Sequence, residues 1–295
     1  MSIGNEEPTR EQRAARRGQK VARLREQLEE KDRELDRLRT RLVARPSDRA
    51  DAIDPQNVIW MFGTGRSGST WLSDMMGDLG NHAVWREPLV GALFGNLYYV
   101  RADHRRGEQG KHFILGRGYK ETWMRPMREM ILGGAAARFP EVLDGGYVVI
   151  KEPNGSIGAP LLMEALPESR MILLVRDHRD VVASSLDARK EGSWLYQRRD
   201  KSKVQTANEN PDRFLKGRAE NYLRDAGNSK EAYDAHKGPK VLVRYEDLRA
   251  DTAGELGGVL RFMGQEPADA ELADCVAFAS VENMRKLEEK SAFWL

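Results

Sequence analysis

The sequence is poor in cysteine and in long apolar runs. Cys275 is the one cysteine among 295 residues, so neither an internal disulfide framework nor a cysteine-rich metal site can form. No run approaches the roughly 20 apolar residues that cross a bilayer, and the N-terminus lacks the apolar stretch of a secretory signal. These absences predict a protein of the reducing cytoplasm without a transmembrane segment.

A surplus of one charge sign is also missing from most of the chain. The net charge is +2, yet residues 1–50 hold 14 Lys and Arg against 10 Asp and Glu, which leaves 34 against 36 for the remainder. A body without a positive surplus argues against binding of long nucleic acid, although it can still focus a few cations on one small anion. The length and the 40% hydrophobic content suit one α/β domain of about 240 residues with an N-terminal appendage.

The appendage carries a heptad pattern over residues 21–42. Its seam positions follow alternating three- and four-residue steps, with Lys31 as the polar exception: Val21, Leu24, Leu28, Leu35, Leu38 and Leu42. The pattern predicts a helix over residues 1–45 that forms a short parallel coiled coil and hence a homo-oligomer, with a solvated single helix as the alternative. Residues 46–56, which begin at a proline, are predicted to be a linker to a domain over residues 57–295.

Beyond the linker, short apolar runs alternate with helical stretches. Four runs are predicted to be buried strands, at residues 58–62, 147–150, 171–175 and 241–243. The alternation indicates an α/β three-layer sandwich, in which helices cover both faces of a central parallel sheet. Ligands of such sheets bind at the carboxyl ends of the strands, so the candidate site residues are those that follow each run.

The first run leads into a glycine-rich turn, residues 63–72 (GTGRSGSTWL), that opens a helix. Glycines let backbone N–H groups approach an anion, and the helix N-terminus adds its positive dipole end. The spacing is close to that of the Walker A phosphate loop, but Ser69 stands where that motif has lysine, and the cation is Arg66 inside the loop. An ordinary tight turn is the alternative. The predicted anion-binding residues are Gly65, Arg66, Ser67, Gly68, Ser69, Thr70 and Trp71.

This loop resembles the 5′-phosphosulfate-binding loop of sulfotransferases that use 3′-phosphoadenosine-5′-phosphosulfate (PAPS). Residues 174–184 (LVRDHRDVVAS) resemble the 3′-phosphate-binding segment of the same family, with Arg176 and Ser184 at the matching positions. Alone, that second string is equally consistent with a helix-capping salt-bridge cluster. Softer matches at residues 243–248 and 280–284 imply that Trp71, Tyr245 and Ser280 lie near the adenine.

The resemblance implies a P-loop-like fold and PAPS as co-substrate. It also implies a hydroxyl-bearing acceptor, which could be a glycan, a lipid or a small molecule. Sulfuryl transfer needs cations where negative charge develops and a base for the acceptor proton. Arg66 and Lys151 are the implied catalytic cations. The five histidines are scattered along the sequence, and no metal site is predicted.

The base implied by the resemblance is a carboxylate. Cytosolic small-molecule sulfotransferases have a histidine two residues after the lysine, and here that position is Pro153. Residues 85–89 (WREPL) resemble instead the Glu-Pro segment of Golgi carbohydrate and tyrosyl-protein sulfotransferases. Glu87 is therefore the candidate base, and Glu152 is the second candidate. Partial burial would raise the pKa of either carboxylate toward neutrality.

Three further expectations concern the rest of the chain. A basic, glycine-containing stretch that closes over the 3′-phosphate in relatives is expected to be missing before Leu295. Acceptor specificity is expected from residues 94–130 and 191–214, which match no family motif. Two alternative functions stay open. One is a P-loop kinase, which would need magnesium and the absent Walker lysine, and the other is a coiled-coil interaction protein with a degenerate nucleotide domain.

Overall fold

The computed structural model describes residues 31–32, 53–101, 112–189, 210–280 and 283. The chain divides into two compact units, residues 1–46 and 47–295, and nearly all described residues belong to the second. In the first unit, only Lys31 and Asp32 are described, and both are helical and exposed. The predicted coiled coil therefore lies outside the described residues.

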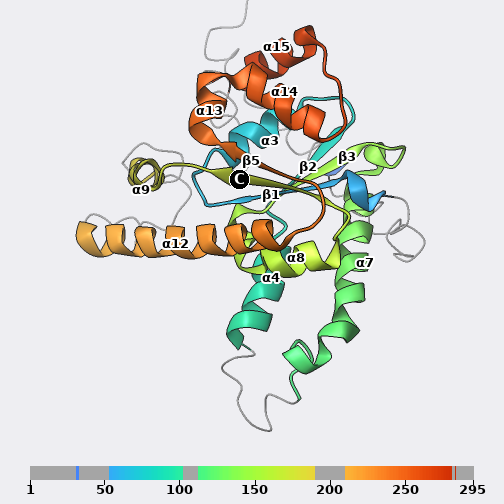
Figure 1. Cartoon of the computed structure of the whole chain (residues 1–295), viewed down its shortest axis with the longest axis vertical. Helices are drawn as coiled ribbons and strands as arrows, with labels where there is room; N and C mark the ends of the chain where they lie inside the picture. Colours follow the sequence, from blue (N-terminus) through green and yellow to red (C-terminus); the bar gives the residue numbers. More distant parts are fainter. Residues whose placement is uncertain (1–30, 33–52, 102–111, 190–209, 281–282, 284–295) are drawn as a thin grey trace, which may run out of the picture. The chain divides into compact units, whose positions relative to one another are not determined.

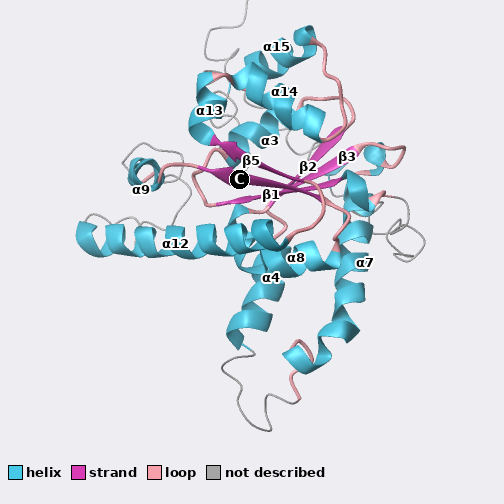
Figure 2. Cartoon of the chain, in the orientation of Figure 1, coloured by secondary structure: helices cyan, strands magenta, loops and turns pink. Residues whose placement is uncertain are grey.

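The second unit is built on a sheet of five parallel strands (Figure 2). They are β1 (Val58–Gly63), β2 (His82–Arg86), β3 (Tyr147–Lys151), β4 (Arg170–Val175) and β5 (Lys240–Arg244), in the spatial order β2-β3-β1-β4-β5. The four predicted strands are confirmed to within about two residues. Sequence analysis did not predict β2, because His82–Arg86 is a short edge strand that mixes polar and apolar residues.

Helices cover both faces of this sheet, which confirms the predicted three-layer α/β sandwich with P-loop-like topology (Figures 1 and 2). One face carries α3 (Ser69–Gly77), α13 (Tyr245–Ala250), α14 (Thr252–Phe262) and α15 (Asp269–Phe278). The other carries α4 (Val90–Gly95), α7 (Lys120–Arg138), α8 (Ala159–Ala165) and α12 (Pro211–Ala235). The helix α9 (His178–Asp187) follows β4.

Short turns of other helix types complete the unit. They are η1 (Pro55–Asn57), η2 (Asn96–Arg101, a π-helix), η3 (Arg117–Tyr119), η4 (Pro140–Val142) and η5 (Pro153–Gly158). Ile53, just before η1, is 3% exposed within the hydrophobic core, so the described end of the predicted linker packs on the domain.

Strand β1 lies at the centre of the sheet and is buried along its whole length. Its side chains alternate between two hydrophobic clusters, since successive residues of a strand point to opposite faces. Trp60 and Phe62 join the cluster under α7, α8 and α12, whereas Ile59 and Met61 join the cluster under α3 and α14. Each such side chain contributes about 1.5–3 kcal/mol through its burial, and together they fix the point at which β1 ends.

The end of β1 is the switch point of the sheet. The chain runs from β1 outward to β2, returns to β3 beside β1, and then crosses to β4 on the other side of β1. The connections after β1 and β3 therefore diverge and leave a crevice at the carboxyl ends, where α/β proteins bind ligands.

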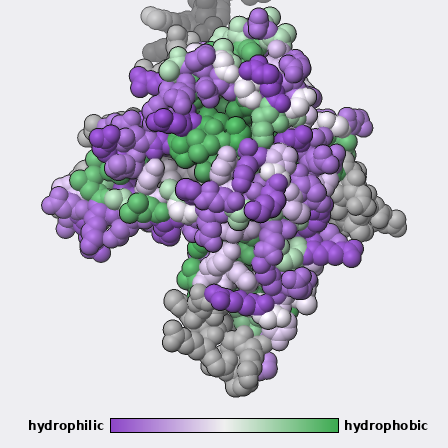
Figure 3. All heavy atoms as spheres, in the orientation of Figure 1, coloured by the Kyte–Doolittle hydropathy of each residue, from purple (hydrophilic) through white to green (hydrophobic). Residues whose placement is uncertain are grey.

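The visible surface in Figure 3 is largely hydrophilic, with a hydrophobic area over β5. Leu242 of this edge strand is 46% exposed. Among the described residues, no helix is long and apolar enough to cross a membrane, and no group of three or more His, Cys, Asp or Glu side chains is arranged to hold a metal ion.

Candidate active site

The glycine-rich turn after β1 has the backbone geometry of an anion-binding loop. Gly63 and Gly68 have φ angles of 155° and 97°, in the region that favours glycine, and Arg66 has φ 72°. A Cβ on Gly63 would lie 2.3 Å from the carbonyl oxygen of Leu174, so only glycine fits there. The backbone N–H of Ser67 donates to the carbonyl oxygen of Thr64 at 3.2 Å, which closes the turn before α3 begins at Ser69.

Two hydroxyl groups inside the turn lack a partner. The Thr64 and Ser67 side chains are 5% and 0% exposed, and neither hydroxyl oxygen has a hydrogen-bond partner among the described residues. Buried hydroxyls are usually paired, because an unpaired one costs free energy. Together with the helix N-terminus, these groups fit a ligand with several acceptor oxygens, such as a phosphate or a sulfate.

The predicted 3′-phosphate residues lie against the same turn. The Nε of Arg66 donates to the hydroxyl of Ser184 on α9 at 3.1 Å, and Nη1 of Arg176 donates to the carbonyl oxygen of Arg66 at 3.1 Å. The Arg176 guanidinium lies 4.1 Å from the centroid of the Tyr245 ring, and its buried Nε has no partner among the described side chains. The structure thus brings together Arg66, Arg176 and Ser184, which belong to two separate sequence motifs.

The predicted adenine residues form a second group beside Arg176. The rings of Trp71 and Tyr245 meet edge to face, with centroids 6.0 Å apart. The indole N–H of Trp71 donates to the carbonyl oxygen of Ala279 at 2.9 Å, which brings Ser280 to the same place. Three segments that are far apart in the sequence, those of Trp71, Tyr245 and Ser280, therefore meet beside Arg176.

The carboxylate of Glu87 lies at the carboxyl end of β2, opposite the loop. Glu87 has φ 51°, and its N–H donates to the carbonyl oxygen of Lys151 at 2.8 Å. Its Oε1 accepts from Nζ of Lys151 at 2.8 Å, and its Oε2 accepts from Nδ2 of Asn154 at 2.6 Å. Lys151 is 5% exposed and also donates to the Thr70 hydroxyl at 3.2 Å. One buried ammonium group therefore joins the candidate base to the first turn of α3.

The second candidate base, Glu152, points away from this group. It is 0% exposed, and its two carboxylate oxygens accept from the backbone N–H groups of Leu89 (3.1 Å) and Gly91 (3.2 Å). Burial raises the pKa of Glu152 to about 7, against the lowering effect of these hydrogen bonds. Glu152 thus contacts the segment after Glu87 instead of the anion loop.

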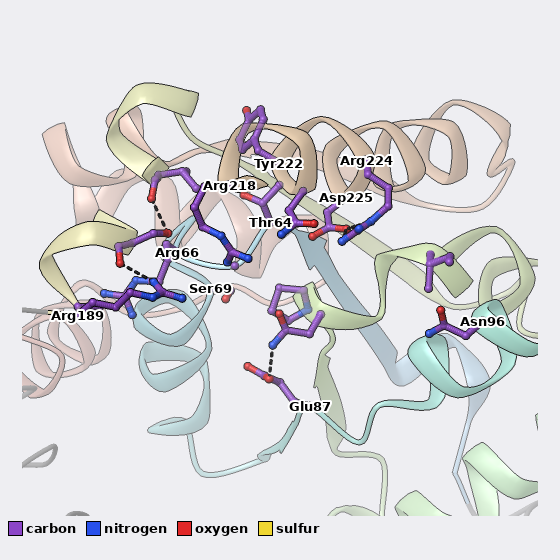
Figure 4. A pocket seen from close by; sticks show the side chains of 18 of the residues that line it. Thr64, Arg66, Ser69, Glu87, Asn96, Arg189, Arg218, Tyr222, Arg224 and Asp225 are labelled. Atoms are coloured by element: carbon purple, nitrogen blue, oxygen red, sulfur yellow. Dashed lines mark hydrogen bonds and ion pairs between the residues drawn. The ribbon is translucent and has the colours of Figure 1, made fainter. Parts of the chain in front are cut away.

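A cavity of about 660 Å³ opens between the loop, β2 and α12 (Figure 4). Four of the predicted residues line it: Gly65, Arg66, Ser69 and Glu87. Trp71, Arg176, Tyr245 and Ser280 are not among its lining residues and form the separate group described above. The glycine-rich turn thus lies between this group, on the side of Tyr245, and the cavity that Glu87 lines.

Sequence analysis missed most of the far wall of this cavity. Asn154 follows β3, and α12 contributes Arg224 and, from one helix face, Arg218, Asn221, Tyr222 and Asp225. Their spacing of three, one and three residues is that of a single helix face, and this was the available signal. Of the segments expected to set acceptor specificity, the first contributes Asn96 and Val100, and most of the second lies outside the described residues.

This wall is polar and carries paired charges. Nε of Arg224 donates to Asp225 at 3.0 Å, and the Tyr222 hydroxyl donates to the carbonyl oxygen of Arg176 at 3.0 Å. Burial raises the pKa of Asp225, against the opposing effect of Arg224 and Arg218. Figure 4 shows Arg66, Arg189 and Arg218 on one side of the cavity and Glu87 on another.

Comparison with known proteins gives one family and several solved structures. The model of the sulfotransferase family matches residues 58–269. The sulfotransferase domain of the curacin biosynthetic pathway is 18% identical, with a TM-score of 0.46 over 73% of this chain and 76% of that one. Sulfotransferase STF9 from Mycobacterium avium is 12% identical, with a TM-score of 0.48 over 78% and 70%. Mouse sulfotransferase SULT7A1, solved with 3′-phosphoadenosine-5′-phosphate (PAP), is 14% identical, with a TM-score of 0.42 over 78% and 66%. No curated protein matches the chain.

The fold and the loop define an α/β protein of the P-loop-like class that is built to bind an anionic nucleotide. The match over residues 58–269 goes further: the chain belongs to the sulfotransferase family. The expected reaction class, sulfuryl transfer with PAPS as co-substrate, is confirmed with the family, and the acceptor is not identified. The alternative prediction of a P-loop kinase has less support than the sulfotransferase prediction, because Ser69 stands at the position of the Walker A lysine.

Proposed function

We propose that this domain transfers the sulfuryl group of PAPS to a hydroxyl group bound in the 660 Å³ cavity, with Glu87 as the general base. The observation that carries the proposal is the contact between Lys151 and Glu87, whose ammonium and carboxylate groups lie 2.8 Å apart. Lys151 also contacts Thr70 in the first turn of α3, so this pair lies where a group held by the loop would face the cavity.

Two groups of residues are proposed to bind the donor. Residues 65–70 and the α3 N-terminus would hold the 5′-phosphosulfate, since a helix N-terminus and the loop hydroxyls, including the buried one of Ser67, supply donors for its oxygens. Arg176 and Ser184 would hold the 3′-phosphate, with Trp71, Tyr245 and Ser280 beside the adenine. The Nε of Arg176 has no partner among the described residues, and this supports the proposal because it supplies a buried donor for a phosphate oxygen.

The reaction needs one bond to form and one to break in line. The acceptor oxygen bonds to sulfur as the bond from sulfur to the bridging oxygen of the 5′-phosphate breaks, and PAP leaves with that electron pair. The acceptor proton passes to the carboxylate of Glu87, and Arg66 and Lys151 stabilise the charge that develops on the leaving oxygen. Lys151 has three N–H donors, and the described contacts with Glu87 and Thr70 occupy two.

Glu87 is proposed over Glu152 because of where the two carboxylates lie. Glu87 lines the cavity, whereas Glu152 is fully buried and contacts the backbone of Leu89 and Gly91. A base must reach the proton that it accepts, directly or through one water. Glu152 does not line the cavity in which the acceptor would bind.

The acceptor is proposed to be a polar hydroxyl compound such as a sugar. Side chains of Asn96, Asn154 and Asn221 line the cavity together with arginines, and such groups hydrogen-bond to hydroxyls. A lipid would instead favour an apolar wall.

Two titrations and one variant test this function. Calorimetry with PAP and with ATP plus magnesium should show tight, metal-independent binding of PAP alone. Glu87→Gln should bind PAP like the wild type but release PAP from PAPS about 10²–10⁴-fold more slowly in a panel of hydroxyl compounds, because the base is lost. Glu164→Gln, on α8 and paired with Lys120, is the matched control. Binding of ATP alone, or an unchanged rate in Glu87→Gln, would refute the proposal.

Two predictions about the protein's setting also remain proposals. We infer self-association through the heptad pattern of residues 21–42 and a reducing, cytoplasmic setting from the single, buried Cys275. Light scattering of the full chain tests the first, and a monomer at micromolar concentration would contradict it.

A further inference from the structure

The segment that carries Glu87 has an unusual backbone. Glu87 and Leu89 both have positive φ angles, 51° and 60°, and they flank Pro88. Non-glycine residues in this region of φ cost of order 1–3 kcal/mol each and persist only where the surrounding structure holds them. The side-chain position of Glu87 therefore depends on contacts that fix the backbone of residues 87–91.

Those contacts come from one short stretch, residues 151–155. Lys151 and Asn154 bind the two carboxylate oxygens of Glu87, at 2.8 and 2.6 Å. Between them, Glu152 binds the backbone of Leu89 and Gly91 from the buried side. Successive residues at a strand end point to opposite sides, so Lys151 faces Glu87 and Thr70 while Glu152 faces the segment behind them.

Glycines make this approach possible. A Cβ on Gly155 would lie 2.1 Å from Oε1 of Glu152, and a Cβ on Gly91 would lie 2.2 Å from the carbonyl oxygen of Gly155. Two further glycines continue the contact, since a Cβ on Gly95 would lie 2.6 Å from the backbone nitrogen of Gly158. The start of α4 is thus packed backbone to backbone against η5, and the Glu152 carboxylate fills the space that Gly155 leaves.

We propose that Glu152 is a positioning residue, whose buried carboxylate holds residues 89–91 so that the Glu87 carboxylate stays against Lys151 and Asn154. The inference rests on the proposed role of Glu87 as base. Glu152 itself does not touch the acceptor or the sulfuryl group. Its carboxylate oxygens accept from two of the N–H groups near the start of α4, which the helix cannot satisfy internally.

The test is Glu152→Gln, which keeps the shape of the side chain but replaces one acceptor oxygen by an NH₂ group. Amide hydrogen exchange over residues 87–92 should become at least about tenfold faster, because one of the two hydrogen bonds to the Glu152 side chain is lost. The maximal rate of PAP release from PAPS should fall, while the KM for PAPS and the affinity for PAP stay unchanged. Glu152→Asp keeps the charge with a shorter reach and should recover part of the rate.

Gly155→Ala provides a second variant that leaves Glu152 chemically intact. The added methyl group should displace the carboxylate and produce the same local exchange and the same loss of rate, and Glu164→Gln should produce neither. Unchanged exchange over residues 87–92 in both site variants would overturn the proposal, as would weaker PAP binding with faster exchange throughout the domain. Amide exchange reports the backbone contacts of residues 87–92 and does not depend on sulfuryl transfer. A Glu87→Gln variant with full activity would therefore overturn the role of Glu87 as base without overturning the positioning role of Glu152.

Discussion

Replacement of Arg176 by alanine tests the donor site most directly. In the structure, the Arg176 guanidinium stacks 4.1 Å from the Tyr245 ring centroid, donates through Nη1 to the carbonyl oxygen of Arg66, and keeps a buried Nε without a partner among the described residues. Two contacts thus orient the group, and its buried Nε–H is a donor that a phosphate oxygen can accept from. Arg176→Ala removes that donor, the positive charge and the support of the Tyr245 ring.

The expected loss can be estimated from these contacts. One hydrogen bond between charged groups contributes about 1.5–3 kcal/mol, so PAP binding should weaken by at least about 2 kcal/mol, or about 30-fold in Kd. Arg176→Lys keeps the charge but not the planar fork, and it should fall between the wild type and the alanine variant.

Isothermal titration calorimetry with PAP measures this effect. Arg179→Ala is the matched control, because Arg179 lies three residues further on, with its guanidinium paired to Asp177 at 2.7 Å, and its loss should leave the Kd unchanged. An Arg176→Ala variant that binds PAP as tightly as the wild type would refute the 3′-phosphate assignment. Equal losses in the two variants would show a general charge effect instead of a specific contact.

Two further predictions concern the loop and the buried carboxylate. Gly68→Ala should weaken PAP binding more than tenfold by calorimetry, because Gly68 has φ 97° and an added Cβ would lie 2.5 Å from Cδ2 of Tyr245. Gly145→Ala is the control for backbone strain, since Gly145 has φ 91° and open space where its Cβ would lie. Equal effects of the two variants on PAP binding would contradict the steric argument. Folding raises the pKa of Glu152 from 4.5 to about 7, so the folded state binds the proton of the Glu152 carboxyl group more tightly than the unfolded state does. The stability that results is present below about pH 4.5 and is lost as the pH rises to about 7. The free energy of unfolding of the wild type relative to Glu152→Gln should therefore fall by about 3 kcal/mol over that window in urea titrations, and a constant difference would count against the shift.

The fold and the anion loop were predictable from local patterns. Runs such as residues 58–62 and 171–175 are apolar throughout because both faces of a central parallel strand are buried. The string of residues 63–72 encodes its own turn, since the positive φ angles at Gly63 and Gly68 and the helix start at Ser69 follow from neighbouring residues. Edge strand β2 gave a weaker pattern, because half-exposed strands tolerate polar residues.

The sequence by itself determined the family and the donor class, because these depend on contiguous segments whose backbone conformation is set locally. Tertiary structure alone decided which carboxylate faces the cavity. Glu87 and Glu152 are both acidic residues next to prolines, and their sequence neighbourhoods do not distinguish a base from a buried hydrogen-bond acceptor. The register of β2 on β3, which pairs Arg86 with Lys151, brings Glu87 to the ammonium group and turns Glu152 toward α4. Such pairings join residues more than 60 positions apart, and only the packed sheet fixes them.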